Sequence, residues 1–194
     1  IAKKRVLDIC AAPGGKTAQL LDAGAIVTAV DISENRLKRL QENISRLQLS
    51  DNLTVLCADA STLSIDDKFD IILLDAPCSA TGTFRRHPEV MNIKSIADVK
   101  KQALLQKAIL ENCVKLLKKG GIILYATCSL SKLEGEKQIS SFLKEHPDFM
   151  IIPVQPEGCK KMLTKEGYLR ILPQHFKEFL GIDGFFIAVL QRKI

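Results

Sequence analysis

The sequence predicts an α/β fold built on an open, mostly parallel sheet with helices on both of its faces. Two observations carry this prediction: the chain contains short, nearly continuous apolar runs, and helical patterns separate them. Apolar runs of this kind are typical of parallel strands that are buried on both faces. Their alternation with helices favours right-handed crossovers. In such sheets ligands bind beyond the carboxyl ends of the strands, where the strand order reverses.

Seven strands are expected. Five apolar runs form the parallel part of the sheet, at residues 5–10, 25–31, 53–59, 69–75 and 121–128. Two further runs, residues 168–173 and 184–191, are expected to form an antiparallel edge hairpin. The segment 147–167 contains three prolines and two glycines. We expect it to be a long loop over the active face.

Helices are expected between the strands. Ser33 is an N-cap candidate, and it is followed by an apolar face with three- and four-residue steps at Leu37, Leu40, Ile44 and Leu47. A long helix from about residue 96 is expected to reach Lys119, with lysines in its last turn and Gly120 as its stop. Ser131 and Glu134 are spaced as a capping box for a further helix.

Composition and charge narrow the class of protein. The 194 residues suit one domain, residues 1–194, and 46% hydrophobic with 26% charged residues is ordinary for a globular protein. No apolar run approaches the roughly 20 residues that span a bilayer, so a membrane protein is not expected. The net charge of +6 favours a polyanionic partner such as nucleic acid. Because the chain begins at Ile1, without a leader, we expect a fragment or a processed domain.

The six cysteines are widely separated and contain no CxxC pair. This spacing excludes the usual metal-ligand patterns, and a disulfide framework is not expected in a domain of this size. We therefore expect a cytoplasmic protein without a metal site. Cys10, Cys57 and Cys113 lie in apolar runs and are expected to be small core residues.

The loop DICAAPGGKT, residues 8–17, follows the first expected strand and leads into a helix. Its small residues allow a ligand to approach the backbone, and a helix N-terminus favours negative charge. A phosphate-binding P-loop requires a glycine where Cys10 stands. A dinucleotide-binding fingerprint requires a third glycine, whereas Gly14 and Gly15 form an adjacent pair. Both interpretations are therefore disfavoured.

Acids at successive strand ends favour a third ligand, S-adenosylmethionine. Asp31 ends the second expected strand, where a carboxylate can accept both ribose hydroxyls, and Asp59 ends the third, where it can contact the adenine amine. Taken singly, each acid is more often a solvated strand end or a turn cap. The predicted cofactor site comprises Cys10, Ala11, Ala12, Pro13, Gly14, Gly15, Lys16, Asp31, Arg36, Asp59 and Asp75.

The motifs CAAPGGKT, AVDISENRL, DAPCSATG with RRHPE, and TCSL resemble those of the Sun/RsmB group of RNA cytosine-5 methyltransferases, which modify ribosomal RNA in bacteria. The resemblance extends from residue 6 to the DGFFIA near the end of the chain. It implies a Rossmann-like S-adenosylmethionine-dependent methyltransferase fold that acts on RNA, with small-subunit ribosomal RNA as the first expectation. It also implies that the N-terminal RNA-binding domain of the family lies outside this chain. The open alternatives are transfer RNA as the substrate, and a non-catalytic, RNA-associated module that only binds the cofactor.

By this resemblance Cys128 is the nucleophile that forms a covalent adduct, and Cys78 assists release of the product. Asp75 would hydrogen-bond to ring nitrogen 3 and the exocyclic amine of cytosine, for which it must be protonated or share a proton. DNA cytosine-5 methyltransferases place their nucleophile in a Pro-Cys motif, so Cys78 is the alternative nucleophile. A buried, inert thiol is the structural alternative for either cysteine.

Arg85, Arg86 and His87 are candidates to hold phosphates beside a target base that has left its stack. A solvated basic loop is the alternative. Two positions depart from the family pattern, because Ala80 stands where glycine usually follows Pro-Cys-Ser, and Gly135 interrupts a common Glu-Asn-Glu. The acids Glu134 and Glu136 are expected chiefly to be helix-start residues. No obligate protein partner is expected.

Overall fold

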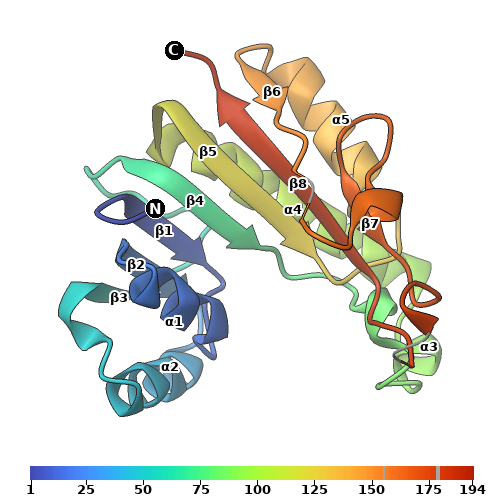
Figure 1. Ribbon diagram of the computed structural model, residues 1–194, viewed down its shortest axis with the longest axis horizontal. Helices are drawn as coiled ribbons and strands as arrows, with labels where there is room; N and C mark the ends of the chain where they lie inside the picture. Colours follow the sequence, from blue (N-terminus) through green and yellow to red (C-terminus); the bar gives the residue numbers. More distant parts are fainter. Residues whose placement is uncertain (155, 178–179) are drawn as a thin grey trace. The chain divides into compact units, whose positions relative to one another are not determined.

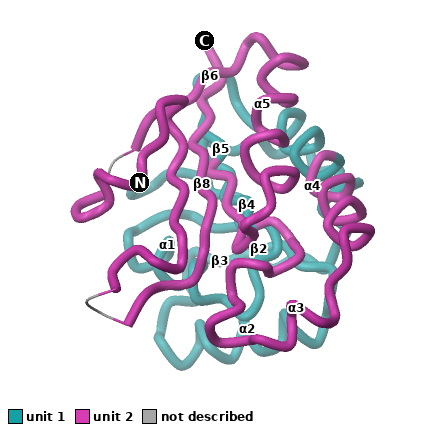
Figure 2. The backbone as a smooth tube through the Cα atoms, turned by 90° about the vertical axis from the view of Figure 1, so that its right-hand side faces the viewer, with its two compact units in different colours: residues 1–75, 108–123, 194 teal, residues 76–107, 124–193 magenta. Residues whose placement is uncertain are grey.

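The computed structural model describes residues 1–154, 156–177 and 180–194, and the chain divides into two compact units (Figure 2). Unit 1 comprises residues 1–75, 108–123 and 194, and unit 2 comprises residues 76–107 and 124–193. Helix α4 (Ile96–Leu116) and strand β5 (Leu117–Thr127) each contribute residues to both units. That residues 1–194 form a single domain remains a prediction.

Unit 1 contains four parallel strands in the order β3-β2-β1-β4 (Figure 1). The chain runs from β1 to β2 to β3 in one direction and then returns to place β4 on the other side of β1. The strand order therefore reverses between β1 and β4, which is where ligands bind in such sheets. The bounds are β1 (Arg5–Ile9), β2 (Ile26–Asp31), β3 (Leu53–Cys57) and β4 (Phe69–Asp75).

Two helices of unit 1, α1 (Gly15–Asp22) and α2 (Glu34–Arg46), pack on these strands. Ser33 caps α2 as expected, because its side chain accepts a hydrogen bond from the backbone N–H of Arg36. The buried core that joins helices and strands comprises Val6, Ala11, Leu21, Ala25, Val27, Ala29, Leu37, Leu40 and Ile44. Leu47, expected on the same face, is exposed and caps the helix at its C-terminus.

The long helix α4 ends earlier than expected, at Leu116, and β5 begins at the next residue. The prediction of helix up to Lys119 was wrong because two side chains favour the strand. Leu117 is buried, and Lys118 Nζ lies 2.8 Å from Asp70 Oδ1 on β4. These contacts outweigh the helical preference of a lysine-rich segment.

In unit 2, strand β8 (Phe185–Arg192) pairs antiparallel with β7 (Leu169–Ile171), which confirms the expected hairpin. It also pairs antiparallel with β6 (Phe149–Ile151), which lies inside the segment expected to be a loop. The buried ring of Phe149 packs edge-on against Phe142 of α5 (Glu136–Glu145), at 5.1 Å between centroids. The described residues thus form eight strands rather than seven.

The remaining helical segments are short. They are η1 (Ser50–Asn52), η2 (Thr81–Thr83), α3 (Val90–Ile93) and η3 (Lys160–Met162). Among the described residues, no helix is long and apolar enough to cross a membrane. The fold class is the expected one: parallel strands alternate with helices, and the C-terminal strands are antiparallel.

Candidate functional site

A cavity of about 370 Å³ opens in unit 1 where the strand order reverses. It is lined by the loop after β1, the first turns of α1 and the last residue of β4. Most of its lining was predicted from the sequence. The lining residues are Asp8, Cys10, Ala11, Ala12, Pro13, Gly15, Lys16, Gln19 and Asp75.

Asp31 and Arg36 hold the loop rather than line the cavity. The Asp31 carboxylate is 2% exposed, and it accepts hydrogen bonds from the backbone N–H groups of Ala12 at 3.3 Å and Ser33 at 3.1 Å. Arg36 pairs with Asp31 and also donates to the carbonyl of Ala12. Asn43 donates to the carbonyl of Pro13 at 3.0 Å. These contacts hold the loop in place. The ribose role of Asp31 remains a prediction.

Asp59 is exposed and does not line the cavity. Its carboxylate accepts from both the hydroxyl and the backbone N–H of Ser61, and these hydrogen bonds lower the pKa of Asp59. This is the turn-capping arrangement that was the alternative for this acid. Contact with adenine remains a prediction.

The two adjacent glycines have different reasons to be glycine. Gly14 has a φ of +99°, and a Cβ there would lie 2.9 Å from Leu40 Cγ, so the backbone conformation and the close helix both require it. A Cβ on Gly15 would meet nothing within 4 Å. Gly15 lines the cavity, so the space beside it is open to a ligand. The protein interior alone does not explain this second glycine.

Asp8 is a buried acid that sequence reasoning left out of the site. Its Oδ2 accepts from Thr17 Oγ1 at 2.6 Å, whereas its Oδ1 is buried and has no hydrogen-bond partner among the described residues. Burial raises the pKa of Asp8 to about 6. An acid inside the apolar run of β1 was the signal that could have identified it. Gln19 was also missed; it lies one helical turn after Gly15.

Lys16 and Asp75 both line this cavity and form an ion pair, with Lys16 Nζ 2.7 Å from Asp75 Oδ2. The lysine comes from the first turn of α1 and the acid from the end of β4. The cavity therefore presents a cation and an unsatisfied carboxylate oxygen close to small residues. This donor set suits a zwitterionic ligand, such as the amino acid end of S-adenosylmethionine.

The cysteines expected in the core divide into three cases. Cys113 is buried, as expected, whereas the prediction for Cys57 was wrong because the thiol at the end of β3 is exposed. Cys10 is half-buried at the cavity, and burial together with the charges of Asp31 and Asp75 raises the pKa of its thiol to about 12. Cys10 is thus a poor nucleophile. No disulfide joins the six cysteines, and the described residues contain no cluster that could hold a metal ion.

Cys78 and Cys128 lie together in unit 2, with their sulfur atoms 3.2 Å apart. They are separated by 50 residues in the sequence, so the convergence expected from the two motifs is present. The hydrogen bond with Cys128, burial and the negative charge of neighbouring groups raise the pKa of Cys78 above its usual range. Two thiols this close cannot both ionise easily, so one of them keeps a proton.

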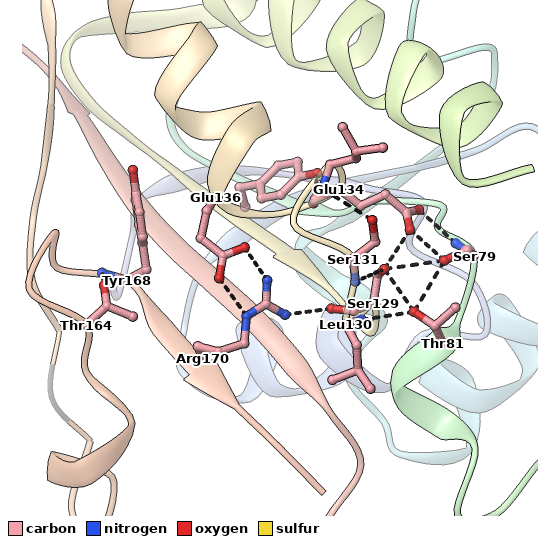
Figure 3. A network of polar contacts seen from close by, with 12 residues as sticks. Ser79, Thr81, Ser129, Leu130, Ser131, Glu134, Glu136, Thr164, Tyr168 and Arg170 are labelled. Carbon is pink, nitrogen blue, oxygen red and sulfur yellow. Dashed lines mark hydrogen bonds and ion pairs between the residues drawn. The ribbon is translucent and has the colours of Figure 1, made fainter. Parts of the chain in front are cut away.

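A polar network holds the two turns that carry these cysteines (Figure 3). Ser79 and Ser129 follow the two cysteines in sequence, and both hydroxyls donate to the carboxylate of Glu134, at 2.5 and 2.6 Å. The capping box predicted for Ser131 and Glu134 was wrong, because α5 begins at Glu136 with Gly135 as its N-cap. The Glu134 side chain accepts hydrogen bonds from the turns that follow the two cysteines, and not from the first turn of α5.

The three basic candidates of the next segment are all exposed. Arg86 is committed to an internal contact, because its Nε donates to Asp183 Oδ2 at 2.7 Å. His87 Nδ1 lies 3.1 Å from Glu89 Oε1. Arg85 is the candidate most available to a phosphate. Contact of any of the three with RNA remains a prediction.

Ala80 occupies a backbone conformation that favours glycine, with a φ of +58°. Glycine is the residue that the family resemblance implies at this position, and it suits this conformation because a Cβ in the left-handed region costs roughly 1–2 kcal/mol. The loop keeps its turn in spite of the extra methyl group. Gly82 N, two residues later, donates to the carbonyl of Cys128 at 2.8 Å.

Comparison with known proteins gives a consistent picture. Residues 2–191 match the model of the family described as 16S rRNA methyltransferase RsmB/F. The chain is 48% identical over 148 residues to ribosomal RNA small subunit methyltransferase B of Yersinia pseudotuberculosis, which covers 75% of this chain and 34% of that protein. It thus spans about a third of the length of the curated relatives it matches.

Two solved structures are also similar. The crystal structure of PH0851 superposes with a TM-score of 0.88 at 34% identity and covers 98% of this chain and 43% of that one. NSun6 from Pyrococcus horikoshii with SFG superposes with a TM-score of 0.81 at 32% identity, covering 97% of this chain and 48% of that one. These similarities agree with the α/β fold described above.

Proposed function

Because the chain belongs to the 16S rRNA methyltransferase RsmB/F family, we propose that it transfers a methyl group from S-adenosylmethionine to carbon 5 of a cytosine in RNA. Small-subunit ribosomal RNA is the first substrate to test, since the curated relatives carry that name. The net charge of +6 is consistent with a polyanionic partner. The protein is proposed to act in the cytoplasm.

The cavity of unit 1 is the proposed cofactor site. Asp8 Oδ1 would accept a hydrogen bond from the ammonium group of the methionine end, and Lys16 would pair with its carboxylate. The open space beside Gly15 and the small residues 11–13 would let the ligand approach the backbone. When bound, S-adenosylmethionine supplies an electrophilic methyl group.

The observation that carries the proposed chemistry is the 3.2 Å separation of the Cys78 and Cys128 sulfur atoms. Carbon 5 of cytosine is a poor nucleophile until a thiolate adds to carbon 6 and turns the ring into an enamine. We assign this addition to Cys128. After transfer the proton on carbon 5 leaves to a base, the electrons of that bond restore the double bond, and the Cys128 sulfur departs. Cys78, whose pKa is raised, holds a proton beside that sulfur and assists its release.

Asp75 is proposed to contact nitrogen 3 and the exocyclic amine of the cytosine. It stands three residues before Cys78 in the sequence Asp-Ala-Pro-Cys. Charge pushed into the ring by addition at carbon 6 is stabilised by a hydrogen-bond donor at nitrogen 3. Asp75 must carry a proton for that contact. Its Oδ2 already accepts from Lys16 Nζ at 2.7 Å, which leaves Oδ1 for the base.

The direct test is a methyl-transfer assay with labelled S-adenosylmethionine, followed by mass spectrometry of the digested nucleosides. Unmethylated small-subunit ribosomal RNA and transfer RNA serve as parallel substrates. The proposal predicts 5-methylcytidine from the ribosomal RNA. Methylation of transfer RNA alone would identify transfer RNA, and not ribosomal RNA, as the substrate. Cofactor binding without any methyl transfer would identify a binding module, and a methyl group on another atom would contradict the proposed chemistry.

A further inference from the structure

We propose that Glu134 is the positioning residue of the two thiols: its carboxylate ties the turns of Cys78 and Cys128 together. The assignment of these thiols to catalysis rests on the proposed function. The role of Glu134 itself follows from contacts within unit 2.

Glu134 is completely buried, and four donors converge on its two carboxylate oxygens. Oε1 accepts from the backbone N–H of Ser79 at 2.8 Å and from Gln106 Nε2 at 3.1 Å. Oε2 accepts from the hydroxyls of Ser79 at 2.5 Å and Ser129 at 2.6 Å. Two backbone or amide N–H groups that can only donate thus share one oxygen, an arrangement that suits a carboxylate anion.

The serines connect this anion directly to the thiols. Ser79 follows Cys78 and Ser129 follows Cys128, and both serines are fully buried. Their hydroxyls lie 3.3 Å apart. Because each serine is covalently adjacent to a cysteine, fixing both hydroxyls on one carboxylate oxygen fixes the spacing of the two turns (Figure 3).

Thr81 adds a second link between the same turns. Its hydroxyl lies 3.1 Å from the hydroxyl of Ser129 and accepts from the backbone N–H of Leu130 at 3.0 Å. Arg170 donates to the carbonyl of Ser129 at 2.7 Å and is itself held by Glu136. Thr81 also reaches Ser79, whose hydroxyl donates to Thr81 Oγ1 at 3.5 Å. The Glu134 carboxylate makes the shorter contacts with the two serines, at 2.5 and 2.6 Å.

Glu134 is itself held by Tyr125 and Gln106. Tyr125, on β5, donates to the Glu134 carbonyl at 2.8 Å and lies 3.0 Å from Gln106 Oε1. Gln106, on α4, also donates to the carbonyl of Pro77 at 2.8 Å, next to Cys78. Side chains from a helix and a strand therefore lock the carboxylate in one position.

The charge of this carboxylate also acts on the Cys78 thiol. Negative charge on Glu134 is one of the causes that raise the pKa of Cys78, after the hydrogen bond with Cys128, burial and the charge of Cys128. A buried carboxylate is costly, and replacement of buried charges by apolar groups is often neutral for stability. Negative charge on Glu134 near Cys78 has a functional consequence, because it favours the protonated form of this thiol, which is the proposed proton donor.

The charge is tested by alkylation of Cys78 with iodoacetamide as a function of pH, in protein that also carries Cys128→Ala so that one thiol of the pair reacts. Glu134→Gln keeps the shape and most hydrogen bonds but removes the charge. It should lower the apparent pKa of Cys78, and alkylation at neutral pH should then be faster by about two- to threefold. Glu145→Gln is the matched control, because Glu145 makes a surface ion pair with Lys107, and its profile should not change. Identical profiles for Glu134→Gln and the parent would overturn the electrostatic part.

A second experiment tests whether Glu134 fixes the two thiols relative to each other. Protein that retains both cysteines is equilibrated with reduced and oxidised glutathione, and the fraction with a Cys78–Cys128 disulfide is measured. Ser129→Ala removes one anchor and keeps the carboxylate, so it remains informative should Glu134→Ala fail to fold. Both should lower the effective concentration of one thiol toward the other by about tenfold. An unchanged value in Ser129→Ala with a native circular dichroism spectrum would overturn the positioning role. Neither experiment uses RNA or S-adenosylmethionine, so failure of methyl transfer and failure of this inference are separate results.

Discussion

The cofactor cavity of unit 1 and the thiol cluster of unit 2 are built in opposite ways. In the cavity, Asp8 Oδ1 has no partner among the described residues, and the space beside Gly15 is open. In the cluster, Glu134 has four donors and the two sulfur atoms are in contact. The first site leaves a buried carboxylate oxygen without a partner, whereas the carboxylate of the second has donors from within the chain on both of its oxygens. We infer that the cavity binds a ligand, and that the contacts within the cluster hold the two cysteines in fixed positions.

The largest effect is expected in the cluster. Cys128→Ala should reduce methyl transfer by about 1,000-fold or more, because the nucleophile is removed. Cofactor affinity, measured by calorimetry, should stay within a factor of about two. Loss of cofactor binding in this variant would show that Cys128 also contributes to the affinity for the cofactor.

Two glycines provide a matched pair for the same comparison. A Cβ on Gly82 would lie 2.2 Å from the carbonyl oxygen of Gly184 and 2.7 Å from that of Cys128. Gly82→Ala should therefore destabilise the protein by about 3 kcal/mol or more in urea unfolding.

Gly15→Ala, in contrast, places its methyl group in open space. Its unfolding free energy should change by less than about 0.5 kcal/mol, because no native contact is lost. Its affinity for S-adenosylmethionine should fall by about tenfold or more, because the methyl group enters the cavity. Equal stability losses in the two alanine variants would show that both glycines are there for packing.

Asp8 gives the cavity a pH signature. Burial raises its folded pKa from 3.8 to about 6, so folding favours the protonated acid. The group contributes stability that is fully present below pH 3.8 and is lost as the pH rises to about 6, by about 3 kcal/mol at most. Asp8→Asn should remove this dependence and stabilise the protein by about 2 kcal/mol at pH 8, while weakening cofactor binding.

Thermal unfolding of Asp8→Asn and the parent protein at pH 4 and pH 8 checks this expectation. The difference between the two proteins, rather than either profile alone, isolates Asp8 from the other acids. A variant that is less stable than the parent at pH 8 would contradict the sign.

The smallest effect is expected in the loop after Cys78. Ala80→Gly removes a side chain from a residue at φ +58° and should stabilise unit 2 by about 0.5 kcal/mol, after the greater flexibility of glycine in the unfolded chain is subtracted. Differential scanning calorimetry can measure it. A lower unfolding temperature would mean that Ala80 makes compensating contacts.

The sequence was most informative where structure is local. The turn from β1 into a helix, the Ser33 cap and the β4 bounds depend on nearby residues, and their structure was predicted correctly. The cap of α5 was not, because Glu134 is drawn away by Ser79, 55 residues distant in sequence. Asp8 was missed as a site residue because its environment depends on the packing of β1 against β2 and β4. Long-range contacts of this kind leave no periodic pattern in the sequence.

The assignment of Cys128 as nucleophile is tested most directly by trapping the covalent adduct. The Cys78→Ala and Cys128→Ala proteins are each incubated with unmethylated small-subunit ribosomal RNA and S-adenosylmethionine, denatured, and digested for peptide mass mapping. The proposed mechanism predicts that Cys78→Ala accumulates RNA attached to the peptide containing Cys128, and that Cys128→Ala forms no adduct. An adduct on Cys78 in the Cys128→Ala protein would reverse the two roles.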